Sequence, residues 1–240
     1  MFKIIKTANY DELSDQAFNI IKNIVTTKPD SVLGLATGSS PVGLYQRMVT
    51  DHQQNGTSYR AVKTVNLDEY LGLPQEHPES YYSFMQRNLF SKLDIPTDNI
   101  HLPEDGADQT EQCRRYDAIL DGLNVDLQLL GIGSNGHIGF NEPGTSFGIK
   151  THVVDLNEST LRDNARFFNS IDEVPKQAIT MGIASIMQAK QILIIASGEN
   201  KADAVAAMIN GPQTVDVPAS ALQSHPNVTV IVDAAAAAKL

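Results

Sequence analysis

Short apolar runs alternate with amphipathic stretches along the chain. Six runs read as strands, at 2–7, 31–37, 62–67, 125–132, 191–197 and 227–233. Between them, apolar residues recur at helical spacing, most clearly at Leu13, Ala17 and Ile24. Nearly continuous apolar strands separated by helices predict an α/β fold, in which a mostly parallel sheet is covered by helices on both faces.

Capping signals mark where several helices begin. Asn9 and Glu12 fit a capping box at the start of the first helix. Asp108 and Glu111 can cap a later helix in the same way. Further helices are predicted at 41–49, at 77–90 with Pro78 in the first turn, and at 199–209.

The bulk properties indicate one globular domain. The 240 residues are 42% hydrophobic and 19% charged, and no Pro/Gly/Ser-rich tract or repeat divides them. A single domain over 1–240 is therefore expected. The net charge of −10 argues against a nucleic-acid surface, which needs a basic patch. An anionic small substrate remains compatible, provided that its site has local cations or backbone N–H donors.

The cysteine content and the N-terminus favour a soluble cytoplasmic protein. Cys113 is the single cysteine, so no internal disulfide can form. Because it recurs at helical spacing with Tyr116 and Leu120, a core thiol is favoured over a nucleophile. The N-terminus has no long apolar segment, and no run reaches membrane-spanning length.

Ligands of parallel α/β folds bind beyond the carboxyl ends of the strands, so the residues there are the candidates. The loop TGSSP follows the strand at 31–37 and offers Thr37, Gly38, Ser39 and Ser40. Backbone N–H groups, hydroxyls and a helix N-terminus at one point suit a phosphate group. An ordinary serine-capped turn fits the same residues.

Two adjacent carboxylates, Asp68 and Glu69, follow the strand at 62–67. They point in different directions, so at most one is expected to face a cleft. One interpretation is a carboxylate base, since an aspartate of ordinary pKa is ionised at neutral pH. The other is an acidic turn without a chemical role.

The stretch GIGSNGHIGFNEPG, 131–144, follows the strand at 125–132 and begins as a dinucleotide fingerprint. That motif should open a helix, but Gly139, Pro143 and Gly144 disfavour one. A loop that carries His137 and Glu142 is the stronger interpretation, because a histidine beside a carboxylate moves protons between oxygens. Zinc is disfavoured, since no second histidine stands at ligand spacing.

Two cations complete the candidates. Arg166 lies in LRDNARFF, and Lys201 begins the helix after the strand at 191–197. A lysine at that position is often simply solvated. With the TGSSP loop, however, the two would complete a phosphate pocket in an acidic protein.

Five strings occur in a fixed order over nearly the whole chain: LGLATGSSP, VNLDEYLGL, HPESYYSFM, GIGSNGHIGFNEPG and NARFF. Together they resemble the glucosamine-6-phosphate deaminases. The resemblance implies a three-layer α/β/α sandwich of Rossmann-like type, without a metal or organic cofactor. It also implies conversion of D-glucosamine 6-phosphate and water into D-fructose 6-phosphate and ammonium.

The resemblance assigns a role to each candidate. His137, assisted by Glu142, would open the pyranose ring, and Asp68 would remove the C2 proton during the aldose–ketose shift. Ammonia is then lost from C2. The phosphate group would be held by the residues Thr37, Gly38, Ser39, Ser40, Arg166 and Lys201.

Two departures from the family pattern are visible. Asn135 stands where some members have an aspartate, and an amide can orient the imidazole without stabilising its cation by a full charge. An Asn135→Asp variant should therefore change the acid limb of the pH–rate profile. His152 and Val154 stand where regulated hexameric members have basic residues, and the chain ends without the longer tail of those members. The expectation is a non-allosteric monomer or small homo-oligomer.

Two rival functions share this fold. A 6-phosphogluconolactonase would also bind a sugar phosphate but would not need a base over C2. A sugar-phosphate sensor of the transcription-regulator type would carry a helix-turn-helix domain, for which the chain has no room before its first strand.

Overall fold

A computed structural model describes residues 2–156, 168, 170 and 173–240. The strands are β1 Lys3–Thr7, β2 Val32–Leu35, β3 Lys63–Asn66, β4 Asp68–Tyr70, β5 Ile100–His101, β6 Leu127–Leu130, β7 His152–Asp155, β8 Gln177–Thr180, β9 Ile192–Ala196 and β10 Val228–Asp233. The α-helices are α1 Tyr10–Thr27, α2 Val42–Asn55, α3 Tyr81–Asn88, α4 Gln109–Leu123, α6 Ile183–Ile186 and α7 Ala202–Asn210. Short 3-10 helices are η1 Phe90–Lys92, η2 Thr97–Asn99, η4 Glu199–Lys201 and η5 Pro218–Ser224.

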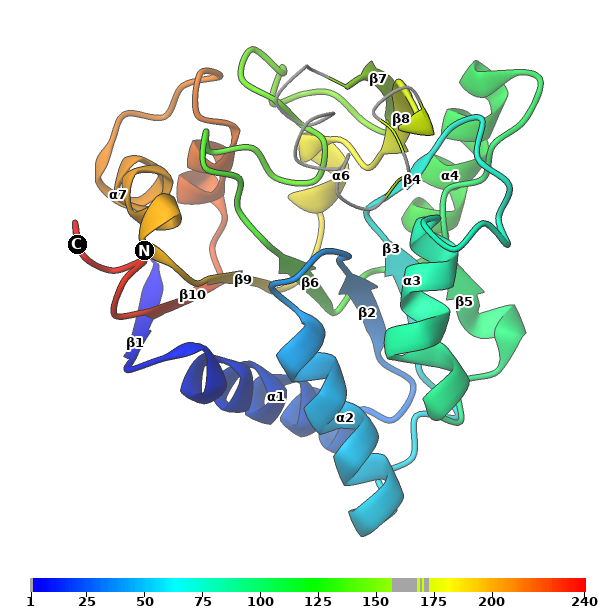
Figure 1. Cartoon of the computed structure of the whole chain (residues 1–240), viewed down its shortest axis with the longest axis horizontal. Helices are drawn as coiled ribbons and strands as arrows, with labels where there is room; N and C mark the ends of the chain where they lie inside the picture. The colour runs from blue at the N-terminus through cyan, green and yellow to red at the C-terminus, as the bar shows by residue number, and fades with distance from the viewer. Residues whose placement is uncertain (1, 157–167, 169, 171–172) are drawn as a thin grey trace.

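Seven of the strands form one parallel sheet in the order β1-β10-β9-β6-β2-β3-β5. Helices α1 and α2 lie on one side of this sheet, and α6 and α7 lie on the other (Figure 1). The parallel, helix-covered sheet predicted from the apolar runs is therefore confirmed. None of the helices in the described part of the chain combines the length and apolar character needed to cross a bilayer.

The two ends of the chain meet in this sheet. β1 is an edge strand that pairs in parallel with β10, with Lys3 opposite Thr229 and Thr7 opposite Asp233. One large hydrophobic cluster then runs from Leu13 on α1 to the residues after β10. The helical spacing of Leu13, Ala17 and Ile24 predicted this buried face correctly, since all three side chains are buried.

A second, antiparallel sheet of three short strands, β4-β8-β7, was not predicted. Its strands have only three or four residues, and β4 consists of Asp68, Glu69 and Tyr70, which look like a polar turn in the sequence. They form a sheet because β8 pairs with both of its neighbours across long separations in sequence. This sheet holds Asp68 opposite Thr180, directly beyond the carboxyl end of β3.

Several helix boundaries differ from the sequence prediction, most clearly those of α3 and α2. The helix predicted at 77–90 begins only at Tyr81, because Ser80 is its N-cap and accepts the N–H of Ser83 at 3.0 Å. Pro78 therefore lies in the preceding turn and not in the helix. α2 begins after Pro41 as predicted but continues to Asn55, where Gly56 ends it with a φ of 72°.

The predicted caps of the other helices are confirmed. Asn9 Oδ1 accepts the N–H of Glu12 at 2.9 Å, and Asp108 Oδ1 accepts that of Glu111 at 3.1 Å.

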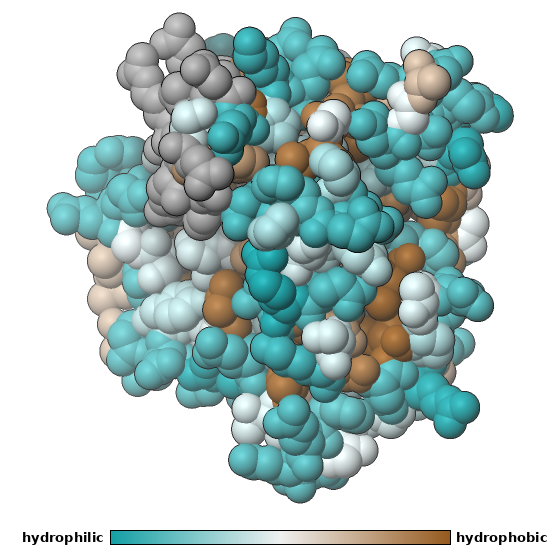
Figure 2. All heavy atoms as spheres, turned by 45° about the vertical axis from the view of Figure 1, so that its right-hand side comes forward, coloured by the Kyte–Doolittle hydropathy of each residue, from teal (hydrophilic) through white to brown (hydrophobic). Residues whose placement is uncertain are grey.

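Hydrophilic residues dominate the face shown in Figure 2. Among the described residues, the exposed large apolar side chains are Ile4 and Val215, which lie far apart in the sequence.

Candidate active site

A cleft of about 660 Å³ opens where the strand order of the large sheet reverses. The chain passes from β2 outward to β3 but from β6 to β9 in the opposite direction, so the loops after β2 and β6 diverge and leave a crevice. Residues that follow four parallel strands line it, at 37–40 after β2, 67–68 after β3, 131–134 and 137 after β6, and 200–201 after β9.

The structure thus brings most of the candidates together, namely Thr37, Gly38, Ser39, Ser40, Asp68, His137 and Lys201. Asn135 and Glu142 lie behind His137 and contact it. Arg166 lies outside the described residues. The positions of these candidates follow from the parallel sheet, since all of its strands end at the same edge.

The 37–40 loop is held from α1. Gly38 adopts a φ of 90°, which only glycine tolerates readily, and α2 begins directly after Pro41. The phenolic oxygen of Tyr10 accepts the N–H of Gly43 at 2.8 Å and lies 3.0 Å from the carbonyl oxygens of both Ser39 and Ser40. The loop is therefore a fixed turn at a helix N-terminus, which suits an anion. Tyr10 was missed in the sequence because it lies about thirty residues from the loop.

Asp68 and Glu69 have separate environments, as expected of neighbours on a strand. Asp68 lines the cleft but is only 6% exposed. Burial, with a smaller contribution from the charge of Glu69, raises the pKa of Asp68 to about 8. The ordinary aspartate pKa assumed from the sequence is therefore wrong. When ionised in this site, the carboxylate is a much stronger base than an aspartate in water.

His137 has a carboxylate behind its ring. His137 Nδ1 lies 3.3 Å from Glu142 Oε1, and both side chains are partly buried. Asn135 Nδ2 donates to Glu142 Oε2 at 2.7 Å, and Asn135 Oδ1 accepts the backbone N–H of His137 at 3.2 Å. Asn135 therefore orients Glu142 and not the imidazole itself, which corrects the direct contact expected from the sequence.

The imidazole lies across Gly133. A Cβ at that position would clash with three atoms of the His137 ring. Gly133 N also donates to the carbonyl oxygen of His137 at 2.9 Å, which closes the turn. Gly133 is therefore needed because the His137 ring approaches the backbone closely at this position. The glycines of a Rossmann loop also allow a close approach, but there the approaching group is a ligand and not a side chain.

The 131–144 stretch does not open a helix, so the dinucleotide interpretation is wrong. Gly136, Gly139 and Gly144 have φ values of 86°, 58° and 96°, which turn the backbone repeatedly. The buried side chain of Asn141 donates to the carbonyl oxygens of Ile138 at 2.8 Å and Met181 at 3.0 Å, which fixes the loop to the end of β8. Among the described residues, no three His, Cys, Asp or Glu side chains gather as around a metal ion.

Helix α3 forms the remaining wall of the cleft and was given no role from the sequence. It contributes Tyr81, Phe84, Arg87 and Asn88. Their spacing places them on one face of a helix, and this was the available signal. Tyr81 stacks on Phe140 with ring centroids 6.0 Å apart and lies 4.7 Å from the ring of Tyr70. An aromatic surface thus faces the acid–base residues.

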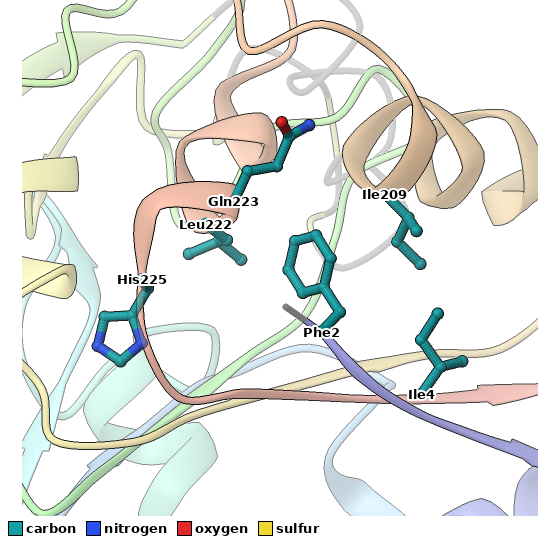
Figure 3. A pocket seen from close by; sticks show the side chains of 6 residues that line it. All are labelled: Phe2, Ile4, Ile209, Leu222, Gln223 and His225. Atoms are coloured by element: carbon teal, nitrogen blue, oxygen red, sulfur yellow. The ribbon is translucent and has the colours of Figure 1, made fainter.

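A second hollow of about 310 Å³ lies between β1, α7 and η5 (Figure 3). Its lining is mostly apolar: Phe2 and Ile4 of the first strand region face Ile209 and Leu222. His225 also lines the hollow, and its Nε2 lies 2.7 Å from the carbonyl oxygen of Ala189. Unlike the larger cleft, this hollow has no carboxyl group among its lining residues in the described part of the chain.

The fold and the larger cleft together define an α/β protein with an acid–base site at the switch point of a parallel sheet. The model of one family, the glucosamine-6-phosphate isomerases and 6-phosphogluconolactonases, matches residues 6–231. The chain belongs to this family.

Individual relatives are similar over nearly their whole length. A glucosamine-6-phosphate deaminase of Geobacillus sp. (strain WCH70) is 57% identical over 96% of this chain and 93% of its own length. One from Bacillus velezensis is 50% identical over 98% of each chain. The solved structure of a monomeric glucosamine-6-phosphate deaminase matches with a TM-score of 0.96 and 47% identity, covering 99% of this chain and 100% of that one. The 6-phosphogluconolactonase of Trypanosoma brucei matches with a TM-score of 0.83 and 22% identity over 100% and 99% of the chains, which shows the shared fold alone.

Proposed function

We propose that this protein is a glucosamine-6-phosphate deaminase of amino-sugar catabolism, which converts D-glucosamine 6-phosphate and water into D-fructose 6-phosphate and ammonium. The observation that carries the proposal is the pairing in one cleft of a buried carboxyl, Asp68, with a carboxylate-backed imidazole, His137. The deaminase relatives, one of them 57% identical over nearly the full chain, support the same activity.

Ring opening is the first step. His137 takes the proton of the anomeric hydroxyl and delivers a proton to the ring oxygen, so that the open aldehyde forms. Glu142, 3.3 Å from Nδ1, stabilises the imidazolium that exists between these transfers. Asn135 keeps the Glu142 carboxylate in place through its hydrogen bond to Oε2.

Asp68 then acts on carbon. The C1 carbonyl makes the C2 proton acidic, and the ionised carboxylate removes it and returns a proton to C1. A second proton passes from the amine nitrogen to the C1 oxygen, so the product of this shift is an imine at C2, which water hydrolyses to the ketone and ammonium. Burial suits this role, because a carboxylate with few water neighbours is a stronger base.

The phosphate group is bound by the loop after β2. Thr37, Gly38, Ser39 and Ser40 supply N–H groups and hydroxyls, and Lys201 supplies a positive charge at the same cleft. Arg166 is proposed as a second cation on the basis of the sequence resemblance. Local cations are required because the chain as a whole carries a net charge of −10.

We further propose that the enzyme is cytoplasmic, binds no nucleic acid, needs no cofactor and acts as a single domain in a monomer or small homo-oligomer. The net charge of −10 disfavours nucleic acid. The scarcity of exposed large apolar residues among those described favours a small assembly. Sedimentation at micromolar concentration tests the assembly, and sigmoidal dependence of rate on substrate would contradict the non-allosteric expectation.

The deciding experiment measures ammonium release from D-glucosamine 6-phosphate by the wild type and by Asp68→Asn. We expect activity in the wild type and a fall of at least about 100-fold in the variant, as for loss of a positioned general base. Asp30→Asn, a change in an exposed turn, should retain activity. A wild type that releases no ammonium but hydrolyses 6-phosphogluconolactone would favour the lactonase function instead.

A further inference from the structure

Glu69 is a buried carboxylate to which the proposed reaction steps give no role. It follows Asp68 on β4 and is 7% exposed. Its two oxygens accept three backbone N–H groups: Oε1 accepts those of Tyr70 at 2.8 Å and Tyr81 at 2.9 Å, and Oε2 accepts that of Tyr82 at 2.8 Å. Burying a carboxylate is costly unless its oxygens are hydrogen-bonded, so the buried position of Glu69 needs a structural explanation.

The three bonds join two elements. Tyr81 and Tyr82 are the first two residues of α3, and their N–H groups have no acceptor within the helix. The third N–H, that of Ser83, goes to the N-cap Ser80. The cap is thus shared between a residue of the same segment and a residue of β4. Glu69 attaches the helix to the strand, whereas Ser80 only terminates it.

The attached helix is the aromatic wall of the cleft. Tyr81, Phe84, Arg87 and Asn88 line the cleft from α3, and Asp68 lines it from β4. Since Glu69 is the residue after Asp68, the same short strand carries the base and the anchor of the α3 wall. A displacement of α3 from β4 would change the width of the space in which C2 must meet Asp68.

We propose that Glu69 is a positioning residue, whose carboxylate ties the N-terminus of α3 to β4 and so holds the cleft wall at a set distance from Asp68. The inference rests on the proposed deaminase function for its catalytic consequence. The tie itself is a property of the fold and is testable without substrate.

The charge of Glu69 has a second consequence. The groups that face Asp68 are Glu69 and Tyr70 on β4, Tyr81 on α3, Tyr116 on α4, and His137 across the cleft. After burial, the charge of Glu69 is what raises the pKa of Asp68. A base must be ionised to act, so kcat/KM falls as the pH drops below this pKa. Removing the charge should move this acid limb to lower pH.

Two substitutions of Glu69 distinguish the effect of its side-chain length from the effect of its charge. Glu69→Asp keeps the charge but is one methylene shorter, so it cannot reach both Tyr81 and Tyr82. We expect kcat to fall by roughly 10- to 100-fold with the acid limb unmoved, as for a misplacement of about 1 Å. Glu69→Gln keeps the length but removes the charge and turns an amide N–H₂ toward a backbone donor. We expect a fall in kcat together with an acid limb at lower pH.

The matched control is Glu76→Gln, which removes an equal charge from an exposed position in the loop before α3. It should keep the wild-type kcat and pH profile. Amide hydrogen exchange of α3 is measured in all proteins, and faster exchange is expected at Tyr81 and Tyr82 in both Glu69 variants only. Should Glu69→Gln fail to fold, Glu69→Asp provides the same exchange and rate measurements.

The outcomes separate the two proposals. Wild-type protein that releases no ammonium contradicts the deaminase function, while the exchange rates of α3 still decide the tie. Unchanged exchange at Tyr81 and Tyr82 overturns the inference. So does a wild-type kcat and pH profile in both variants, or an equal loss in Glu76→Gln.

Discussion

Asp68 is a carboxyl group that folding removes from water, and this has a consequence for stability. Its pKa is about 8 in the folded protein, against an ordinary 3.8. Between these two values the folded state keeps a proton that the unfolded state has lost. Stability therefore decreases as the pH rises through this window, and the full penalty is present above the folded pKa.

Replacing Asp68 by Asn should raise the melting temperature, because the amide needs no proton to be buried. The gain over the wild type should be small near pH 5, grow toward about pH 8 and then stay level. Thermal melts from pH 5 to 9 measure it, with Asp30→Asn as the exposed control. A difference between Asp68→Asn and the wild type that does not vary with pH would contradict the burial argument.

Gly133 can be tested through the ring that lies on it. In Gly133→Ala the new methyl group occupies the place of the His137 imidazole, which must rotate away from Glu142. We expect kcat/KM for ammonium release to fall by roughly 100-fold, the usual contribution of a general acid–base residue. Gly122→Ala is the control, because its Cβ meets no atom within 4 Å and it lies in α4. That change should keep activity and stabilise the helix by up to about 1 kcal/mol.

Asn135 is the residue of this loop that holds the Glu142 carboxylate. Asn135 Nδ2 now donates to Glu142 Oε2 at 2.7 Å, and an aspartate at this position would place a second carboxylate beside that of Glu142. The like charges should either separate or share a proton, and both results weaken the support of His137. We expect a lower kcat at neutral pH in Asn135→Asp. A kcat equal to that of the wild type would show that Glu142 is not held in this way.

At the scale of elements, the turn after β9 is held from the end of β10. Asp233 is the residue at the end of β10 that accepts these hydrogen bonds. Burial opposes the charge of Asp233, but hydrogen bonds from Ser197 Oγ, Ala236 N and Gly198 N lower its pKa. Gly198 has a φ of 97°, so the turn needs both a glycine and a fixed acceptor. The turn leads into η4, which presents Lys201 to the cleft.

Asp233→Asn should therefore weaken substrate binding more than chemistry. The variant keeps an acceptor oxygen but loses the charge, so the turn and Lys201 lose part of their support. We expect KM to rise about tenfold, equivalent to ~1.4 kcal/mol, with kcat changed much less. Asp203→Asn, an exposed change on α7, is the control. A variant in which kcat falls while KM stays constant would contradict a role in binding.

The elements differ in how well the sequence predicted them. Six strands of the large sheet were predicted from their apolar runs, and three of them, β2, β6 and β9, are buried over their whole length. The small β4-β8-β7 sheet was missed because its strands have only three or four residues and β4 and β8 are distant in the sequence. The start of α3 was misplaced by four residues for a related reason. The cap that sets it includes Glu69, which belongs to another element.

At the scale of the whole molecule, the pairing of β1 with β10 makes the two ends of the chain part of one sheet. The large hydrophobic cluster contains residues from α1 through to Ala237, so no cut in the sequence separates two cores. We expect one calorimetric unfolding transition, with a calorimetric enthalpy equal to the van't Hoff enthalpy. Two resolved transitions would contradict a single cooperative core.

The sequence by itself determined the alternation of strands and helices, the polar residues at the strand ends and the family to which they point. These depend on local periodicity and on motifs, which neighbouring residues encode. Only the tertiary structure decided that Asp68 is buried enough to hold its proton near neutral pH, that Asn135 supports Glu142, that Tyr10 anchors the loop after β2, and that Glu69 anchors α3. Each of these depends on which distant segments exclude water from a group or reach its hydrogen-bonding atoms, and a linear pattern does not specify that.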